Sequence, residues 1–178
     1  KIYLLHGDLS LEQMNYLYAH PKIKSYLTLT HGEGFGIPIF EAAYHNVPII
    51  APAWSGQCDF LYAPTISGKN KKPKVRPLFC RVDYTLGEIP EDVVWSGVLE
   101  EGSLWCCPTE KSSKQCMRDM YTNYTRYVGM AKKLHKHIIT NFSEEKQYTQ
   151  FANVIIDKEE LELEDWLSNF SEELQVHE

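Results

Sequence analysis

The 178-residue sequence lacks any uninterrupted apolar run of the roughly 20 residues that a membrane-spanning helix needs. It also lacks an initiator methionine, and its opening apolar run is too short for a secretory signal. We therefore expect no transmembrane segment. A chain that opens on a strand-like segment without a lead-in is also typical of a fragment, so we expect a longer natural polypeptide.

Paired cysteine motifs are missing as well. The five cysteines are odd in number and none forms a C-x-x-C pair, a pattern that predicts neither a disulfide framework nor a zinc site. The pattern favours reduced thiols in a cytoplasmic protein. We expect no metal site.

An excess of basic residues is the third absence, because the net charge is −6. Residues 157–178 hold nine acidic side chains and one lysine, a balance of −8 that leaves +2 for the rest. A nearly neutral body with an acidic tail is not the charge distribution of a nucleic-acid-binding protein. We expect residues 1–156 to form one domain and 157–178 an acidic C-terminal helix or tail.

What the chain does contain is an alternation of short apolar runs and helix-like segments. The first fifty residues predict strands over Ile2–Leu5, Lys24–Thr30 and Val47–Pro52, with helices after Ser10 and from Pro38. This order predicts right-handed crossover units and a parallel sheet. The expected fold class is α/β.

Beyond Pro64 the pattern is less regular. It predicts strands over 78–82 and 93–98, one long helix over Ser112–Ile139 and another helix after Ser143. The run from Lys69 to Arg76 carries five cations, typical of a solvated loop, although it could also form a lip that meets an anionic acceptor or a membrane surface. Trp105 could pack against the domain or form the wall of a ligand site.

The segment HGEGFGIPIFEAA, His31–Ala43, lies between a predicted strand and a predicted helix. Pro38 suits the first turn of that helix, and Asn46 suits its end. The loop before Pro38 then lies at the carboxyl edge of a parallel sheet, where open α/β sheets bind ligands.

The backbone N–H groups of Phe35, Gly36 and Ile37 would be unpaired donors at the start of this helix. Such donors, together with the helix dipole, form a site for a phosphate or diphosphate. Glycine lets the ligand approach the backbone closely.

Glu33 and Glu41 lie on either side of this anion site. Glu41 is flanked by apolar residues, and a buried carboxylate needs a partner, which could be a cation or a pair of vicinal hydroxyls. Glu33 could hold a second polyol. A diphosphate with a hydroxylated ring at each end is a nucleotide-sugar. The alternative is two ordinary glutamates, one solvated and one in an ion pair.

The ten residues EGFGIPIFEA, Glu33–Ala42, resemble the signature of retaining GT-B glycosyltransferases of family four, in which two glutamates separated by seven residues bracket Gly-Phe-Gly. The flanking segments Gly7–His20 and Asn46–Leu61 also resemble that family, the second through its Gly-x-x-acid from Gly56 to Asp59. The resemblance covers about a third of the chain. It implies a Rossmann-like sheet with flanking helices, the C-terminal donor-binding part of a GT-B fold.

The resemblance also implies roles for individual residues. Glu41 would bind the ribose hydroxyls. Glu33 would orient the donor sugar rather than attack it, and the two glutamates form the expected catalytic pair. The remaining expected ligand contacts are backbone groups: Gly34, Phe35 and Gly36 at the sugar, Gly36 and Ile37 at the diphosphate, and Gly7, Asp8 and Leu9 at the nucleobase.

His31 and Gly32 are also expected among the binding residues. They stand where the family often has a turn containing Pro-Ser, so the sequence departs from the family there. The family's acceptor domain and the basic pair that grips the diphosphate would lie upstream of this chain.

The resemblance thus implies the donor-binding portion of a retaining, metal-independent hexosyltransferase that is inactive as this fragment. Its substrates would be a nucleotide-diphosphate sugar and an acceptor, which could be a glycan, a lipid or a protein. No cofactor is expected. A GT-B nucleotide-sugar epimerase and a non-catalytic nucleotide-sugar-binding module remain as alternatives. A glucan phosphorylase-like enzyme would need a pyridoxal-bearing lysine, for which the sequence offers no candidate.

Overall fold

The computed structural model describes residues 1–66 and 72–155. The chain divides into two compact units, Lys1–Ile139 and Thr140–Glu178. The first unit holds the sheet and most of the helices, and the second is described only through the end of α5 and helix α6.

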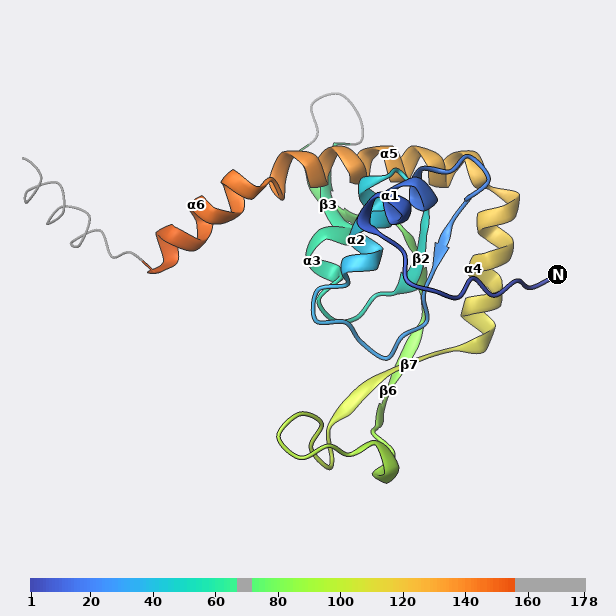
Figure 1. Ribbon diagram of the computed structural model, residues 1–178, viewed down its shortest axis with the longest axis vertical. Helices are drawn as coiled ribbons and strands as arrows, with labels where there is room; N and C mark the ends of the chain where they lie inside the picture. Colours follow the sequence, from blue (N-terminus) through green and yellow to red (C-terminus); the bar gives the residue numbers. More distant parts are fainter. Residues whose placement is uncertain (67–71, 156–178) are drawn as a thin grey trace, which may run out of the picture. The chain divides into compact units, whose positions relative to one another are not determined.

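A small parallel sheet forms the centre of the first unit (Figure 1). Its strands are β1 (Tyr26–Leu27), β2 (Ile49–Pro52) and β5 (Cys80–Val82), in the order β1-β2-β5. The register places Tyr26 opposite Ile49 and Ile50 opposite Cys80. All four residues of β2 are buried, as a continuously apolar run in a parallel sheet predicts. The expected α/β class with a parallel sheet is confirmed at this level.

The helices beside the first two strands begin and end where the sequence predicts. Helix α1 spans Leu11–Ala19, and Ser10 and Gln13 form a reciprocal capping box at its start. Helix α2 spans Ile37–Tyr44 and ends just before Asn46, whose φ of 60° is the left-handed conformation that asparagine tolerates. The short helix α3 covers Cys58–Leu61.

The strand predicted over Ile2–Leu5 is wrong. These residues form no strand, and their four side chains are exposed, Ile2 completely. A continuously apolar strand is stable in a parallel sheet when both of its faces are covered. The neighbouring β1 is only two residues long, shorter than the predicted Lys24–Thr30, and offers little backbone for pairing.

Two antiparallel hairpins lie on either side of β5 in the sequence. Strands β3 (Tyr62–Thr65) and β4 (Lys74–Pro77) form the first, and β6 (Tyr84–Glu88) and β7 (Leu104–Pro108) form the second. The β6–β7 hairpin extends away from the parallel sheet (Figure 1).

The strand predicted over 93–98 is also wrong. A 3-10 turn at Glu91–Val93 is followed by a tight reversal in which the N–H of Trp95 donates to the Leu99 carbonyl. Gly97, with φ of 82°, allows that reversal, which no extended strand could contain.

The single helix predicted over Ser112–Ile139 is two helices, α4 (Glu110–Thr122) and α5 (Tyr124–Asn141). The interruption is Asn123, whose side-chain amide donates to Asp119 Oδ1 at 2.6 Å. The backbone of Asn123, with φ of −110° and ψ of 34°, departs from helical values, and this ends α4. The predicted apolar stripe still packs, because Met120 and Tyr127 join Ile50 of β2 in one core cluster.

Helix α6 covers Glu144–Ile155, which confirms the helix predicted after Ser143. The acidic segment 157–178 and the cations Lys69 and Lys71 lie outside the described residues. Among the helices of residues 1–66 and 72–155, none combines the length and the hydrophobicity that a bilayer crossing requires.

Candidate functional site

The loop from His31 to Gly36 connects β1 with α2, at the carboxyl edge of the parallel sheet. Gly36 precedes the helix with a φ of 86°. A Cβ there would lie 3.2 Å from Ile39 Cδ1 and 3.3 Å from Gln57 Cβ. Both the conformation and the space therefore favour glycine at the start of α2.

A second loop holds the first one in place. Ser55 Oγ accepts a hydrogen bond from the N–H of Glu33 at 3.1 Å and donates to the Glu33 carbonyl at 2.6 Å. The N–H of Gly56 donates to the same carbonyl at 3.1 Å. A Cβ on Gly56 would lie 1.8 Å from the carbonyl oxygen of Gly34, so the two loops approach as closely as glycine permits.

Gln57 is the buried polar side chain beside this contact. It is 1% exposed, and its amide nitrogen donates to the Pro52 carbonyl at 3.2 Å. Its Oε1 is buried and has no hydrogen-bond partner. A buried acceptor without a donor costs about 1–3 kcal/mol. Gln57 is thus an unsatisfied acceptor next to the start of α2.

The histidine at the head of the loop is held by β7. His31 Nδ1 lies 2.6 Å from the Cys106 carbonyl oxygen, and the N–H of Cys106 donates to the His31 carbonyl at 3.0 Å. Because a carbonyl only accepts, Nδ1 carries the proton. The imidazole also stacks on Trp105, with ring centroids 3.9 Å apart. Trp105 therefore packs on the loop itself, and this contact fixes the orientation of His31.

Glu41 lies half-buried on α2, and its partner is Tyr18 of α1. The Glu41 carboxylate acts on the Tyr18 hydroxyl and favours its protonated form. Burial, together with the nearby Tyr26 and the charge and hydrogen bond of Glu41, raises the pKa of Tyr18 to about 12. The partner that a half-buried carboxylate requires is thus a phenol on the preceding helix, where the sequence led us to consider a cation or ligand hydroxyls.

Tyr26 of β1 links the two glutamates. Burial raises the pKa of its hydroxyl, and the negative charges of Glu33 and Glu41 raise it further. Both carboxylates therefore act electrostatically on one phenol, Glu33 from the loop and Glu41 from the helix.

The start of α2 leaves backbone donors available. In the described part of the chain, the N–H groups of Gly36 and Ile37 have no hydrogen-bond acceptor. Ile37 is 62% exposed. Phe35 packs on Phe40 and Phe60, at centroid distances of 5.3 and 5.1 Å. The aromatic contacts fix the loop while the helix start remains accessible.

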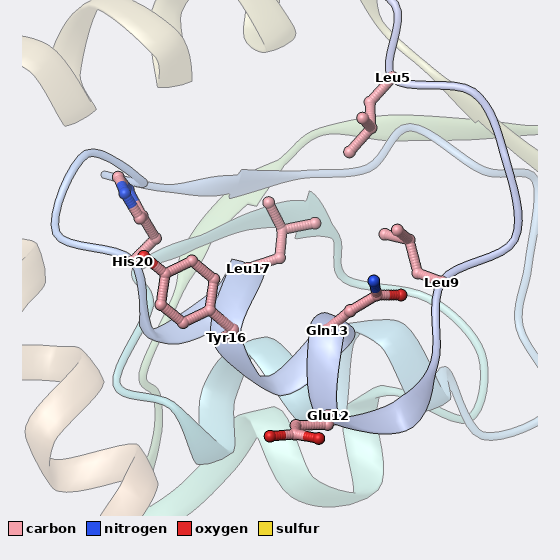
Figure 2. A pocket seen from close by; sticks show the side chains of 7 residues that line it. All are labelled: Leu5, Leu9, Glu12, Gln13, Tyr16, Leu17 and His20. Atoms are coloured by element: carbon pink, nitrogen blue, oxygen red, sulfur yellow. The ribbon is translucent and has the colours of Figure 1, made fainter.

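Gly7, Asp8 and Leu9 belong to the exposed segment before α1. Within the described residues, no hydrogen bond joins them to the loop His31–Gly36. Leu9 instead lines a cavity of about 390 Å³ against α1. Figure 2 shows Leu9, Leu5 and Leu17 turned toward this common space. The structure thus groups Leu9 with α1.

Sequence reasoning missed three residues that build this site. Tyr18 lies within the helix predicted after Ser10, and its only signal is a hydroxyl group at a buried position that leucine could also fill. Ser55, with φ of 73°, and Gln57 give no signal in the sequence, because their contacts depend on how two loops meet. Gly56 was noted for its spacing to Asp59, and the structure adds its steric role.

Over residues 1–66 and 72–155, no group of three or more histidine, cysteine or acidic side chains is arranged to hold a metal ion. In comparisons with known proteins, no protein-family model, no curated protein and no solved structure matches this chain.

Proposed function

We propose that this chain is the donor-binding portion of a retaining glycosyltransferase that transfers a sugar from a nucleotide-diphosphate sugar to an acceptor. The observation that carries the proposal is the open start of α2, with Glu33 in the loop before it and Glu41 on the helix itself. The charges of both glutamates also raise the pKa of Tyr26. The resemblance of Glu33–Ala42 to the family-four signature supports the same reading, including a Rossmann-like, GT-B arrangement of the sheet.

In this proposal the diphosphate binds at the N-terminus of α2. The N–H groups of Gly36 and Ile37 point from the positive end of the helix dipole, where an anion is stabilised by about 0.3–2 kcal/mol. As the glycosidic bond breaks, negative charge grows on the leaving phosphate, and these fixed donors meet it without reorganisation.

The two glutamates would hold the hydroxyl groups. A carboxylate has about four acceptor positions, so Glu41 can interact with Tyr18 and still accept from two ribose hydroxyls. Glu33, fixed through its backbone by Ser55, would orient the sugar.

A titration of the 178-residue chain with uridine-, guanosine- and adenosine-diphosphate sugars, followed by NMR of the backbone amides, tests the proposal. We expect shifts concentrated at residues 33–37. We also expect a dissociation constant in the high micromolar range or weaker, which corresponds to about −5 kcal/mol, because the upstream basic pair is not in this chain. Saturable binding that leaves residues 33–37 unshifted would refute this site.

Two glutamate variants sharpen the test. Glu41→Gln should weaken donor binding by about 1–3 kcal/mol, the cost of losing a charged hydrogen bond. With Glu41→Gln, the binding of a deoxyribose donor should weaken less than the binding of a ribose donor. Glu12→Gln, the same change at an exposed position on α1, serves as the control. Equal losses for ribose and deoxyribose donors would remove the ribose role from Glu41 and favour a module that only binds the diphosphate.

A further inference from the structure

A second cavity in the first unit is lined by cations. Its volume is about 440 Å³, and it lies between strands β4 and β5 and helix α5. Four of its lining residues are basic, namely Arg76, Arg81, Arg126 and Lys133. No acidic side chain occurs among the described lining residues. We call this cavity the basic pocket.

These four cations come from a helix and two strands that meet at the cavity. Arg126 and Lys133 are seven residues apart on α5, two helical turns, so they share one face of the helix. Arg81 is the exposed central residue of β5, between the buried Cys80 and Val82. Arg76 comes from the edge strand β4. Three separate elements thus direct positive charge to one place.

The floor of the basic pocket is apolar. Leu78 is 6% exposed and Phe79 is 3% exposed, and both line the cavity together with Met130. A ligand seated there would meet an apolar surface beneath a ring of cations. That combination suits an organic anion as well as an inorganic one.

The cations have little compensation from the protein. Arg126 Nη1 lies 3.8 Å from Asp119 Oδ2, and this carboxylate already accepts hydrogen bonds from Tyr127 and Asn123. Within the described residues, Arg76, Arg81 and Lys133 have no ion-pair partner. Like charges gathered in this way repel one another, and a bound multivalent anion would relieve that repulsion.

The basic pocket is separate from the proposed donor site. Leu78 and Phe79 immediately precede β5, so the pocket lies at the amino end of this strand. The loop His31–Gly36 follows the carboxyl end of β1, and β1, β2 and β5 are parallel. The two sites are therefore at opposite edges of the sheet.

We propose that the basic pocket binds a phosphorylated small molecule that carries at least two negative charges, with pyrophosphate as its simplest mimic. Three of the four cations are arginines, whose planar guanidinium groups match phosphate oxygens in pairs. This inference goes beyond the donor site and does not depend on it.

The test is a titration of the full 178-residue chain with pyrophosphate at constant ionic strength, followed by amide NMR. We expect saturable shifts at residues 76–81 and 126–133. Lys133→Gln should weaken binding about fivefold, which is close to 1 kcal/mol for one charge-assisted phosphate contact. Lys132→Gln, the same change one position earlier on α5 and outside the pocket lining, should leave the affinity unchanged.

Several results would overturn the proposal. One is the absence of saturation at millimolar pyrophosphate. Equal weakening by Lys132→Gln and Lys133→Gln would reduce the effect to diffuse surface charge. Equal affinity for citrate would remove the preference for phosphate. Shifts confined to residues 33–37 would place the anion at the start of α2 and leave the basic pocket without a ligand.

Discussion

Position 56 is where the two loops of the candidate site come closest. A methyl group on Gly56 would lie 1.8 Å from the Gly34 carbonyl oxygen, a backbone atom that no side-chain rotation can move away. We expect Gly56→Ala to destabilise the fold by about 1–3 kcal/mol or more, as overpacking does. Urea unfolding of the variant and of the parent protein measures this: the midpoint should fall while the m-value stays the same.

Gly34→Ala is the matched control for this change. A Cβ on Gly34 would have no atom within 4 Å, so the same substitution should cost little there. If the two alanine variants unfold at the same urea concentration, the loop contact through Gly56 is not a constraint on the fold.

The influence of Glu41 on Tyr18 can be measured by spectroscopy. Burial raises the pKa of Tyr18 to about 12, and the charge and hydrogen bond of Glu41 add to this rise. Glu41→Gln should therefore lower the pKa of Tyr18 toward its ordinary value, although burial will keep it somewhat raised. Ultraviolet titration of the variant with and without Tyr18→Phe isolates this one phenol.

Glu33→Gln is the comparison for this titration. Glu33 acts on Tyr26 but is not among the groups that raise the pKa of Tyr18. It should leave the Tyr18 titration unchanged. A Tyr18 pKa that shifts equally in both glutamine variants would contradict a specific influence of Glu41 on Tyr18.

At the scale of elements, the junction between α4 and α5 depends on Asp119. Hydrogen bonds from Tyr127 and then Asn123 hold the pKa of this carboxyl below its ordinary value of 3.8. Because the pKa is lowered in the folded state, charged Asp119 stabilises the fold. This stabilisation is fully present above pH 3.8 and is lost as acid protonates the carboxylate. Tyr127→Phe should therefore lower the urea midpoint at pH 7 but have a progressively smaller effect as the pH falls below 3.8.

Tyr121→Phe is the control, because the Tyr121 ring on α4 is 90% exposed and its hydroxyl has no described role. Urea unfolding at pH 7 and pH 3 compares the variants. A Tyr127→Phe effect of the same size at both pH values would show that the charge of Asp119 does not contribute to the junction.

The elements that the sequence predicted well are those whose signals are local. The cap at Ser10, Pro38 at the start of α2 and the left-handed Asn46 at its end are encoded within a few residues. The strand expected over Ile2–Leu5 fails because pairing needs a neighbour, and hydrophobicity alone does not supply one. The break at Asn123 was not predicted, because the apolar periodicity of the sequence continues from α4 into α5.

The candidate site shows the same division. The start of α2 and its two glutamates could be read from a short motif, since glycines, proline and acidic residues lie close together in the sequence. The hydrogen bonds between Ser55 and Glu33 join residues 22 positions apart, and the contact between His31 and Cys106 joins residues 75 positions apart. Such contacts arise from the tertiary fold, so a single sequence carries no local sign of them.

At the scale of the whole molecule, the five cysteine thiols differ in burial and therefore in expected reactivity. Cys80, Cys106 and Cys116 are buried, whereas Cys58 and Cys107 are half-buried. Burial raises the pKa of Cys106 to about 11 and that of Cys116 to about 12, so few thiolates form at these positions. We expect a thiol reagent at pH 8 to modify Cys107 well before its neighbour Cys106.

Peptide mapping by mass spectrometry after short labelling times measures this order, and labelling in urea provides the reference in which all five cysteines react. If Cys106 and Cys107 are modified at the same rate in the folded protein, strand β7 opens readily and the description of its buried face is wrong.

The β6–β7 hairpin should be separable from the rest of the first unit. Gly87 pairs with Trp105, so replacing residues 88–104 by Asn-Gly closes the strands with a two-residue turn. Trp105 and Cys106 keep their contacts to His31, and Ile89 is the one buried residue of the removed segment. We therefore expect the shortened chain to lose no more than the roughly 2–5 kcal/mol that removal of one buried apolar side chain costs. Loss of cooperative unfolding would show that the hairpin tip supports the sheet.

The stack of His31 on Trp105 also makes the loop optically visible. Indole emission responds to whatever lies against the ring, and here an imidazole lies 3.9 Å away and nearly parallel, at 7°. Any event that moves the head of the loop must change that pairing, and with it the brightness or colour of the Trp105 emission. The protein therefore carries, within its own sequence, a fluorophore placed against the segment whose movements are of most interest.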